Sequence, residues 1–178
     1  MYAIVNKKQI MAEISIESGD ITLLSVDAII NAANTRLIPG TGVDGAIHKA
    51  AGPKLWDACM HIGGCETGQA VITPAFNLKA KYVIHTPSPV IEQENSEELL
   101  SDCYKNSLIL AQKNNIQTIA FPLIGAGFGG GFSADTASKI AVSAIKEFIK
   151  ENPNEFTIIK IIAFKKDFEA ALHRAISN

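Results

Sequence analysis

Apolar residues fall into two patterns that alternate along the chain. Short apolar runs of strand length predict β-strands, and they lie at 3–5, 10–16, 26–30, 69–73, 82–86, 118–123 and 156–164. Longer segments with apolar residues at helical spacing predict helices, and they lie at 43–51, 53–62, 96–113, 134–151 and 168–176. Strands that alternate with helices predict a three-layer α/β/α fold with a mixed, largely parallel central sheet.

Polar residues indicate where several helices begin. Asn95 and Glu98 have the spacing of a capping box, which predicts a helix starting there. Ser133 is expected to cap the next helix, and Asp167 the last one. No internal repeat or linker interrupts the pattern, so we expect residues 1–178 to form a single domain.

The most distinctive stretch is 31–52, NAANTRLIPGTGVDGAIHKAAG. It follows an apolar run, crosses a glycine loop and enters a helix, an arrangement that predicts a pocket wall. Asn31 and Asn34 offer amide donors and acceptors, although asparagines at a strand end often only satisfy backbone groups. Asp44 stands at the helix start, where the helix dipole favours negative charge.

A second glycine loop, 125–131, lies between a strand and the helix that Ser133 caps. Five glycines in seven positions favour a cradle whose backbone amides bind a diphosphate, and a flexible surface loop is the alternative. Gly125, Gly127 and Gly130 also satisfy G-x-G-x-x-G. A dinucleotide-binding domain would need an acidic residue after the next strand, and Lys165 stands there instead.

These motifs resemble those of macro domains, the Appr-1-p processing or MacroD-like family, which bind ADP-ribose. The resemblance rests on NAAN followed by GVDGAIH, on GDIT at 19–22 and on VIHT at 83–86, and it spans roughly 14–176. It implies a macro domain fold and an ADP-ribose pocket. The second loop departs from the branch that the first motif resembles, because it is glycine-rich and about one residue longer.

The resemblance also implies roles for single residues. Asn34 and Asp44 would be catalytic: Asn34 would reach the distal ribose, and Asp44 would handle a water beside it. Asn31 would brace the loop and is also expected among the substrate-binding residues. Asp20 would accept a hydrogen bond from the adenine amino group, whereas from the sequence alone it could be an ordinary turn-capping aspartate.

Further substrate contacts follow from the same resemblance. Phe128 is preferred over Phe132 as the aromatic that covers the distal ribose, and Phe132 could equally be a core residue. Thr41 replaces a usual glycine and adds a side chain near that ribose. The remaining expected substrate-binding residues are Ile21, Gly40, Gly42, Val43, Gly125, Ala126, Gly127 and Phe164.

The resemblance implies three functions for this pocket. The first is a hydrolase that cleaves ester-linked ADP-ribose, either from aspartate or glutamate side chains or from O-acetyl-ADP-ribose. The alternatives are a non-catalytic reader of ADP-ribose and an ADP-ribose-1″-phosphate phosphatase. A catalytic pair of Asp44 and His48 at i and i+4 is discounted, because the family's histidine at this place is structural.

Charge and cysteine content narrow the setting. The net charge of −2 and the lack of a basic block do not favour nucleic acid as a partner. Cys59, His61 and Cys65 are too few for a tetrahedral metal site, so we expect no metal and no cofactor. An odd number of cysteines, no signal peptide and no membrane-length apolar run favour the cytoplasm. The expected partner is ADP-ribose or an ADP-ribosylated protein, and the oligomeric state stays open.

Overall fold

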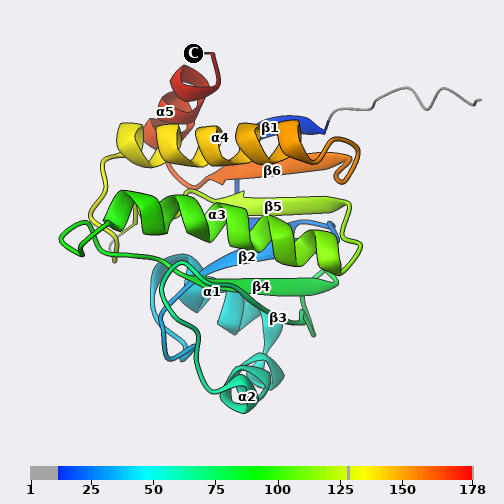
Figure 1. Ribbon diagram of the computed structural model, residues 1–178. Coiled ribbons are helices and arrows are strands. Elements are labelled where there is room, and N and C mark those ends of the chain that lie inside the picture. The colour runs from blue at the N-terminus through cyan, green and yellow to red at the C-terminus, as the bar shows by residue number, and fades with distance from the viewer. Residues whose placement is uncertain (1–11, 128, 178) are drawn as a thin grey trace, which may run out of the picture.

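The computed structural model describes residues 12–127 and 129–177. Within them, six strands form one sheet in the order β1-β6-β5-β2-β4-β3 (Figure 1). Neighbouring strands are parallel except β3 and β4, which are antiparallel. The strands are β1 (Glu13–Ser18), β2 (Ala28–Ala33), β3 (Val71–Pro74), β4 (Tyr82–Pro87), β5 (Thr118–Pro122) and β6 (Ile158–Ala163). The expected mixed, largely parallel sheet is confirmed.

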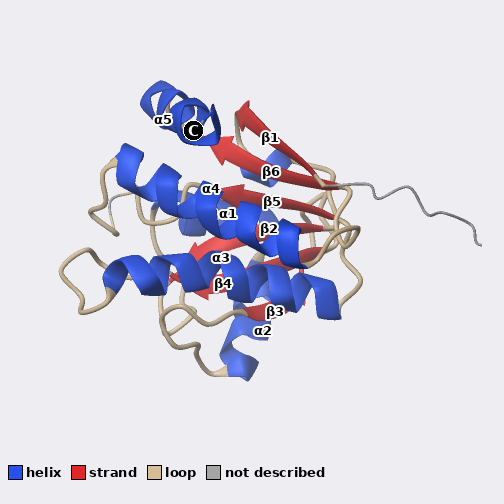
Figure 2. Cartoon of the chain, turned by 45° about the horizontal axis from the view of Figure 1, so that its top comes forward, coloured by secondary structure: helices blue, strands red, loops and turns tan. Residues whose placement is uncertain are grey.

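Helices cover both faces of this sheet (Figures 1 and 2). Their bounds are α1 (Gly42–Ala51), α2 (Pro53–Ile62), α3 (Ser96–Lys113), α4 (Ala134–Glu151) and α5 (Lys166–Ser177), with a short 3-10 helix, η1 (Ile21–Leu23). One face packs against α3, α4 and α5, and the other against α1, α2 and η1. The three-layer prediction is therefore confirmed. No helix in the described part of the chain has the length and apolar character needed to cross a membrane.

The central strand β2 shows why its sequence is continuously apolar. Ala28, Ile29 and Ile30 are all fully buried. Ile30 faces the layer of α3 and α4, whereas Ile29 faces the layer of α1. Successive side chains of a strand point to opposite faces, so a strand covered on both sides needs apolar residues at every position.

Asp27 joins three strands at their amino ends. Its Oδ2 accepts hydrogen bonds from the backbone N–H groups of Gln117 (3.1 Å) and Thr118 (2.9 Å), just where β5 begins. Its Oδ1 accepts a 2.7 Å bond from Lys81, which precedes β4. Burial alone would raise the pKa of this carboxyl, but these hydrogen bonds outweigh it and lower the pKa to about 2.

Two of the predicted helix caps are wrong and one is confirmed. Asn95 has a φ of 56°, and its side chain makes no capping bond, so there is no capping box. With left-handed backbone at Asn95, its side chain does not reach the first N–H groups of the helix. Asp167 lies inside the first turn of α5, which begins one residue earlier. The Ser133 hydroxyl does accept a 3.1 Å bond from the N–H of Thr136.

Some strands differ in extent from the prediction. β2 continues beyond Ile30 to Ala33, because Asn31 pairs with His85 of β4 in the parallel ladder. β3 begins at Val71, two residues later than expected. The predicted strand at 3–5 lies outside the described residues.

Candidate active site

The predicted site residues gather where the parallel strands end. Asp20 follows β1, Asn34 follows β2, the glycine loop follows β5 and Phe164 follows β6 (Figure 1). Parallel strands have their carboxyl ends at one edge of the sheet, and in open α/β folds ligands bind outside that edge. The fold therefore brings together four segments that are far apart in the sequence.

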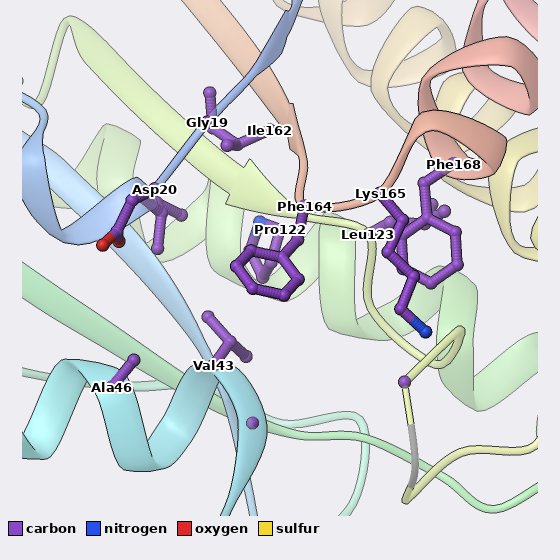
Figure 3. A pocket seen from close by; sticks show the side chains of 13 residues that line it. Gly19, Asp20, Val43, Ala46, Pro122, Leu123, Ile162, Phe164, Lys165 and Phe168 are labelled. Carbon is purple, nitrogen blue, oxygen red and sulfur yellow. The ribbon is translucent and has the colours of Figure 1, made fainter.

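A cavity of about 270 Å³ lies at this edge. Its walls are mainly apolar, and its charged side chains are Asp20 and Lys165. Figure 3 shows the ring of Phe164 in the middle of this space, with Asp20 to one side and Lys165 and Phe168 to the other. The lining residues are Gly19, Asp20, Ile21, Gly42, Val43, Ala46, Pro122, Leu123, Gly127, Ile162, Phe164, Lys165 and Phe168.

Two aromatic side chains dominate the wall built after β6. Phe164 is 80% exposed, which is unusual for so large an apolar side chain and suits a residue that a flat ligand covers. The Nζ atom of Lys165 lies 5.4 Å from the centroid of the Phe168 ring, within the range of a cation–π contact. Sequence reasoning found Phe164 but not Lys165 or Phe168 as part of this wall.

The carboxylate of Asp20 caps η1 and also lines the cavity. Its Oδ1 accepts bonds from the N–H of Thr22 (2.9 Å) and from the Thr22 hydroxyl (2.7 Å). Both bonds use the same oxygen, so Oδ2 takes part in neither. The turn-capping role is therefore real, and it leaves an acceptor for a ligand.

Glycines of the second loop serve different ends. Gly125 has a φ of 84°, and a Cβ there would lie 3.0 Å from the ring of Phe132 and 3.1 Å from Leu100. A Cβ on Gly130 would overlap the carbonyl of Gly125. At Gly127, by contrast, a Cβ would meet nothing within 4 Å, and Gly127 lines the cavity. Packing therefore requires the first two, whereas Gly127 leaves room for a ligand.

The structure removes one of the two candidate aromatics for the distal ribose. Phe132 is 4% exposed and packs in the core beneath α3 and α4, so it cannot cover a ligand. Phe128, which the sequence favoured, lies outside the described residues, and its role stays a prediction. Ala126 is half-buried next to Gly127.

Asp44 holds the loop between β2 and α1. Its side chain is buried, and its Oδ1 accepts a 2.6 Å bond from Nδ2 of Asn31. Its Oδ2 accepts a 2.5 Å bond from the N–H of Gly40. The loop comes so close to the helix that a Cβ on Gly45 would lie 2.6 Å from the Gly40 carbonyl oxygen. Asp44 therefore fixes Gly40 beside the first turn of α1, which faces the cavity through Gly42 and Val43.

The two asparagines point in different directions, as expected if the strand continues past Asn31. Asn31 is fully buried and contacts Asp44, so geometry supports the bracing role. Asn31 does not line the cavity, and its substrate contact stays a prediction. Asn34 is half-buried and closes its own turn: its Nδ2 donates to the carbonyl of Ile38 at 2.7 Å. Thr41 precedes α1, and its hydroxyl makes no capping bond. Ribose contacts by Asn34 and Thr41 stay predictions.

Two buried histidines lie beside the pair formed by Asp44 and Asn31: His48 is next to Asp44, and His85 is next to Asn31. His48 Nε2 lies 3.6 Å from Asp44 Oδ1, too long for a hydrogen bond. Burial lowers the pKa of His48, and the Asp44 carboxylate partly opposes that effect. His85 was singled out only as part of a motif, yet its Nδ1 lies 3.1 Å from Nδ2 of Asn31. In the sequence, the one sign of a special role for His85 is that a polar side chain interrupts the apolar strand at 82–86.

The environments of the three cysteines do not favour the thiolate, the reactive form of the side chain. Burial, with a smaller contribution from Asp44, raises the pKa of Cys59 to about 11. Burial likewise raises the pKa of Cys65, and that of Cys103 to about 11. Thiols with raised pKa values stay protonated near neutral pH. Over the described ranges, no three or more His, Cys, Asp or Glu side chains are grouped so that they could hold a metal ion.

Fold and site together define an α/β domain with a ligand cavity between a helix start and a glycine loop. A model of the Macro domain family matches residues 30–141. The chain belongs to the macro domain family.

Known relatives agree with this assignment. The chain is 46% identical over 167 residues to the ADP-ribose glycohydrolase MACROD2 of Xenopus laevis, covering 92% of this chain but only 40% of that protein. It is 51% identical over 144 residues to the O-acetyl-ADP-ribose deacetylase of Salmonella newport, covering 78% and 80% of the two chains. The Trypanosoma brucei macrodomain in complex with ADP-ribose superposes with a TM-score of 0.88 at 35% identity, covering 96% and 72%.

Proposed function

We propose that this macro domain binds ADP-ribose and hydrolyses ester-linked ADP-ribose. The substrates would be mono-ADP-ribosylated aspartate or glutamate side chains of proteins, or O-acetyl-ADP-ribose. The observation that carries the proposal is the Asp44 carboxylate, held at the start of α1 beside Gly40 and next to cavity-lining Gly42 and Val43. The names of the two relatives, a glycohydrolase and a deacetylase, support the same class of reaction.

The cavity suggests how the ligand lies. Adenine fits between Asp20 and Phe164, where a carboxylate accepts from its amino group and an exposed ring covers its face. The diphosphate fits between the N–H groups at the start of α1 and the loop at Gly127, because helix starts bind anions. This direction carries the distal ribose towards Gly40, Thr41 and Asn34.

Hydrolysis would then proceed by addition of water to the ester. Water attacks, the ester C–O bond breaks, and the products are a carboxylic acid and a free hydroxyl on the ribose. An ionised carboxylate has about four lone-pair sites, and Asp44 uses two of them for Asn31 and Gly40. The remaining sites can orient the attacking water and accept its proton. Asn34 would hold the ribose.

A reader without catalysis is the second candidate. The observation in its favour is that both oxygens of Asp44 already hold the protein's own loop, a role that needs no chemistry. In that case the same pocket would bind ADP-ribose attached to a partner protein and release it unchanged.

The setting that we infer follows from the sequence. We propose that residues 1–178 act as one macro domain in the cytoplasm without a metal or an organic cofactor. Its partners would be ADP-ribose and ADP-ribosylated proteins rather than nucleic acid. The net charge of −2 and the unpaired cysteines support this setting.

Incubating the wild-type protein with three substrates tests the function. These are a glutamate-modified protein, O-acetyl-ADP-ribose and ADP-ribose-1″-phosphate. We expect release of ADP-ribose from the two esters. A protein modified through arginine is the control, because its N-glycosidic link is no ester and should survive. Binding without release from either ester would favour the reader, and release from the phosphate alone would favour a phosphatase.

Asp20 provides a test of the adenine end. We expect Asp20→Asn and Asp20→Ala each to weaken ADP-ribose binding by about 1.5–3 kcal/mol, because each removes a charge-assisted hydrogen bond. Asp20→Asn keeps an oxygen that can cap η1, whereas Asp20→Ala does not. Calorimetry on both variants therefore separates the loss of the ligand contact from the loss of the cap. Thr22→Val is the matched control, since it alters the cap and leaves the carboxylate. Wild-type affinity in Asp20→Asn would leave Asp20 with capping alone.

A further inference from the structure

Four side chains form a continuous buried line from β3 to α1. Thr73 Oγ1 lies 3.0 Å from His85 Nε2, and His85 Nδ1 lies 3.1 Å from Asn31 Nδ2. The same Nδ2 donates to Asp44 Oδ1 at 2.6 Å. Each of the four is buried, and His85 and Asn31 have no exposed surface at all. Of the four, Asp44 is the one that belongs to α1, whose first turn lines the cavity through Gly42 and Val43.

The orientation of the Asn31 amide follows from its two neighbours. Turning the amide over would place its oxygen against the Asp44 carboxylate, two acceptors in contact. The NH₂ group therefore faces both Asp44 and His85, and uses one hydrogen for each. Asn31 Oδ1 has no hydrogen-bond partner among the described residues. Leaving this buried acceptor unpaired costs free energy, so the two contacts of the NH₂ group determine the orientation of the amide.

This arrangement requires one form of the His85 ring. Nδ1 must be the acceptor, because the group opposite it is an N–H donor. The proton then sits on Nε2, which can donate to the Thr73 hydroxyl. A protonated ring would place a donor against a donor. The neutral ring with its proton on Nε2 is therefore the form that keeps Asn31 in place.

The surroundings of His85 favour that neutral form. Burial, with a smaller contribution from His48 of α1, lowers the pKa of His85 to about 3. The ring centroids of the two histidines are 6.3 Å apart. From α2, the Cys59 thiol lies 3.8 Å from Nε2, and its raised pKa keeps it uncharged. The Asp44 carboxylate reaches the ring only through Asn31.

We propose that His85 is a positioning residue for hydrolysis: as an acceptor at Nδ1 it fixes the Asn31 amide, which in turn aims the Asp44 carboxylate. Its contacts are with Asn31, Thr73 and Cys59, so it acts on the chemistry through Asn31. The inference rests on the proposed function of Asp44. Misplacing a catalytic group by about 1 Å can lower a rate by about two orders of magnitude.

A matched pair of variants tests the acceptor. In asparagine, Oδ1 is as many bonds from Cα as Nδ1 is in histidine, so His85→Asn keeps an acceptor towards Asn31. In His85→Leu, the leucine side chain has nearly the same shape as asparagine but carries no hydrogen-bond acceptor. We expect His85→Leu to lower kcat about tenfold with KM and the Kd for free ADP-ribose nearly unchanged, and His85→Asn to recover most of the loss. Equal kcat values for the two variants would overturn the proposal.

Thr73→Val provides a second test if the His85 variants fold poorly. It keeps the ring but removes the hydroxyl that holds the proton on Nε2, so we expect kcat to fall severalfold. In the wild type, ¹⁵N NMR should show His85 unprotonated at Nδ1 from pH 8 to pH 5. A proton on Nδ1 anywhere in that range, or unchanged kcat in Thr73→Val, would contradict the proposed line of contacts.

The failure of the proposed function can be told apart from the failure of this inference. If the wild type cleaves no ester, the proposed function is wrong, and the ¹³C resonance of the Asp44 carboxyl replaces kcat as the readout. It should move in His85→Leu and return towards the wild-type value in His85→Asn. An equal shift in both variants would show that His85 does not position Asp44.

Discussion

Asp44→Ala is expected to hydrolyse ester-linked ADP-ribose at least ten times more slowly than the wild type, because a positioned acid–base group contributes roughly 10²–10⁴-fold to a rate. Affinity for free ADP-ribose should change much less, since the proposed contacts at Asp20, Phe164 and Gly127 do not involve Asp44. A lower kcat with retained affinity marks a group that acts mainly in the transition state. Single-turnover release from a glutamate-modified protein, paired with calorimetry, measures both.

The structure adds a second effect of the same substitution. Asp44 accepts bonds from buried Asn31 and from the N–H of exposed Gly40, and leaving the buried Asn31 donor unsatisfied costs about 1–3 kcal/mol. Asp44→Ala should therefore also be less stable by roughly that amount, which chemical unfolding measures. Asn34→Ala is the comparison variant, and we expect it to lose both binding and rate. Wild-type rates in a folded Asp44→Ala protein would exclude Asp44 from the mechanism.

Gly127→Val is expected to abolish detectable ADP-ribose binding without unfolding the domain. A Cβ at Gly127 meets no protein atom within 4 Å, so the fold accommodates it. The added side chain would instead occupy the cavity where the diphosphate is proposed to lie. Calorimetry should show at least a hundredfold loss of affinity, and the unfolding midpoint should stay close to that of the wild type.

Gly129→Val is the matched control in the same loop. Gly129 also has open space around its Cβ position, but it does not line the cavity. We expect Gly129→Val to bind nearly as well as the wild type. If both variants bind normally, the diphosphate lies elsewhere; if both lose binding equally, the loop responds to bulk in general and not to the position of Gly127.

The sequence was most informative about features of the fold that neighbouring residues determine. The apolar run at 28–30 predicts a strand covered on both faces, and Ser133 predicts a helix start, because both depend on neighbouring residues. Asn95 shows the limit of this reasoning, since its spacing to Glu98 suits a capping box but its backbone is left-handed. The cavity end formed by Asp20 and Phe164 was predicted only through the family resemblance.

Contacts that depend on strand register could not be predicted. Asn31 and His85 are 54 residues apart and meet because β2 and β4 are parallel neighbours. Their meeting turns Asn31 towards Asp44, which no spacing in the sequence reveals. In the same way, the sequence left open whether Phe132 faces the ligand or the core, and the structure places it in the core, packed next to Gly125.

The cavity joins the two ends of the described chain. Among the described residues, Asp20 follows β1, which pairs with β6, while Phe164 comes just after β6 and Phe168 lies in α5. A molecule bound in this cavity would therefore contact both the segment that follows β1 and the first turn of α5. A ligand that binds only the folded protein stabilises the folded state by about 2.7 kcal/mol when its concentration is 100 times its Kd. We therefore expect a bound ligand to slow proteolysis at both segments, because an opening that separates them would have to release the ligand.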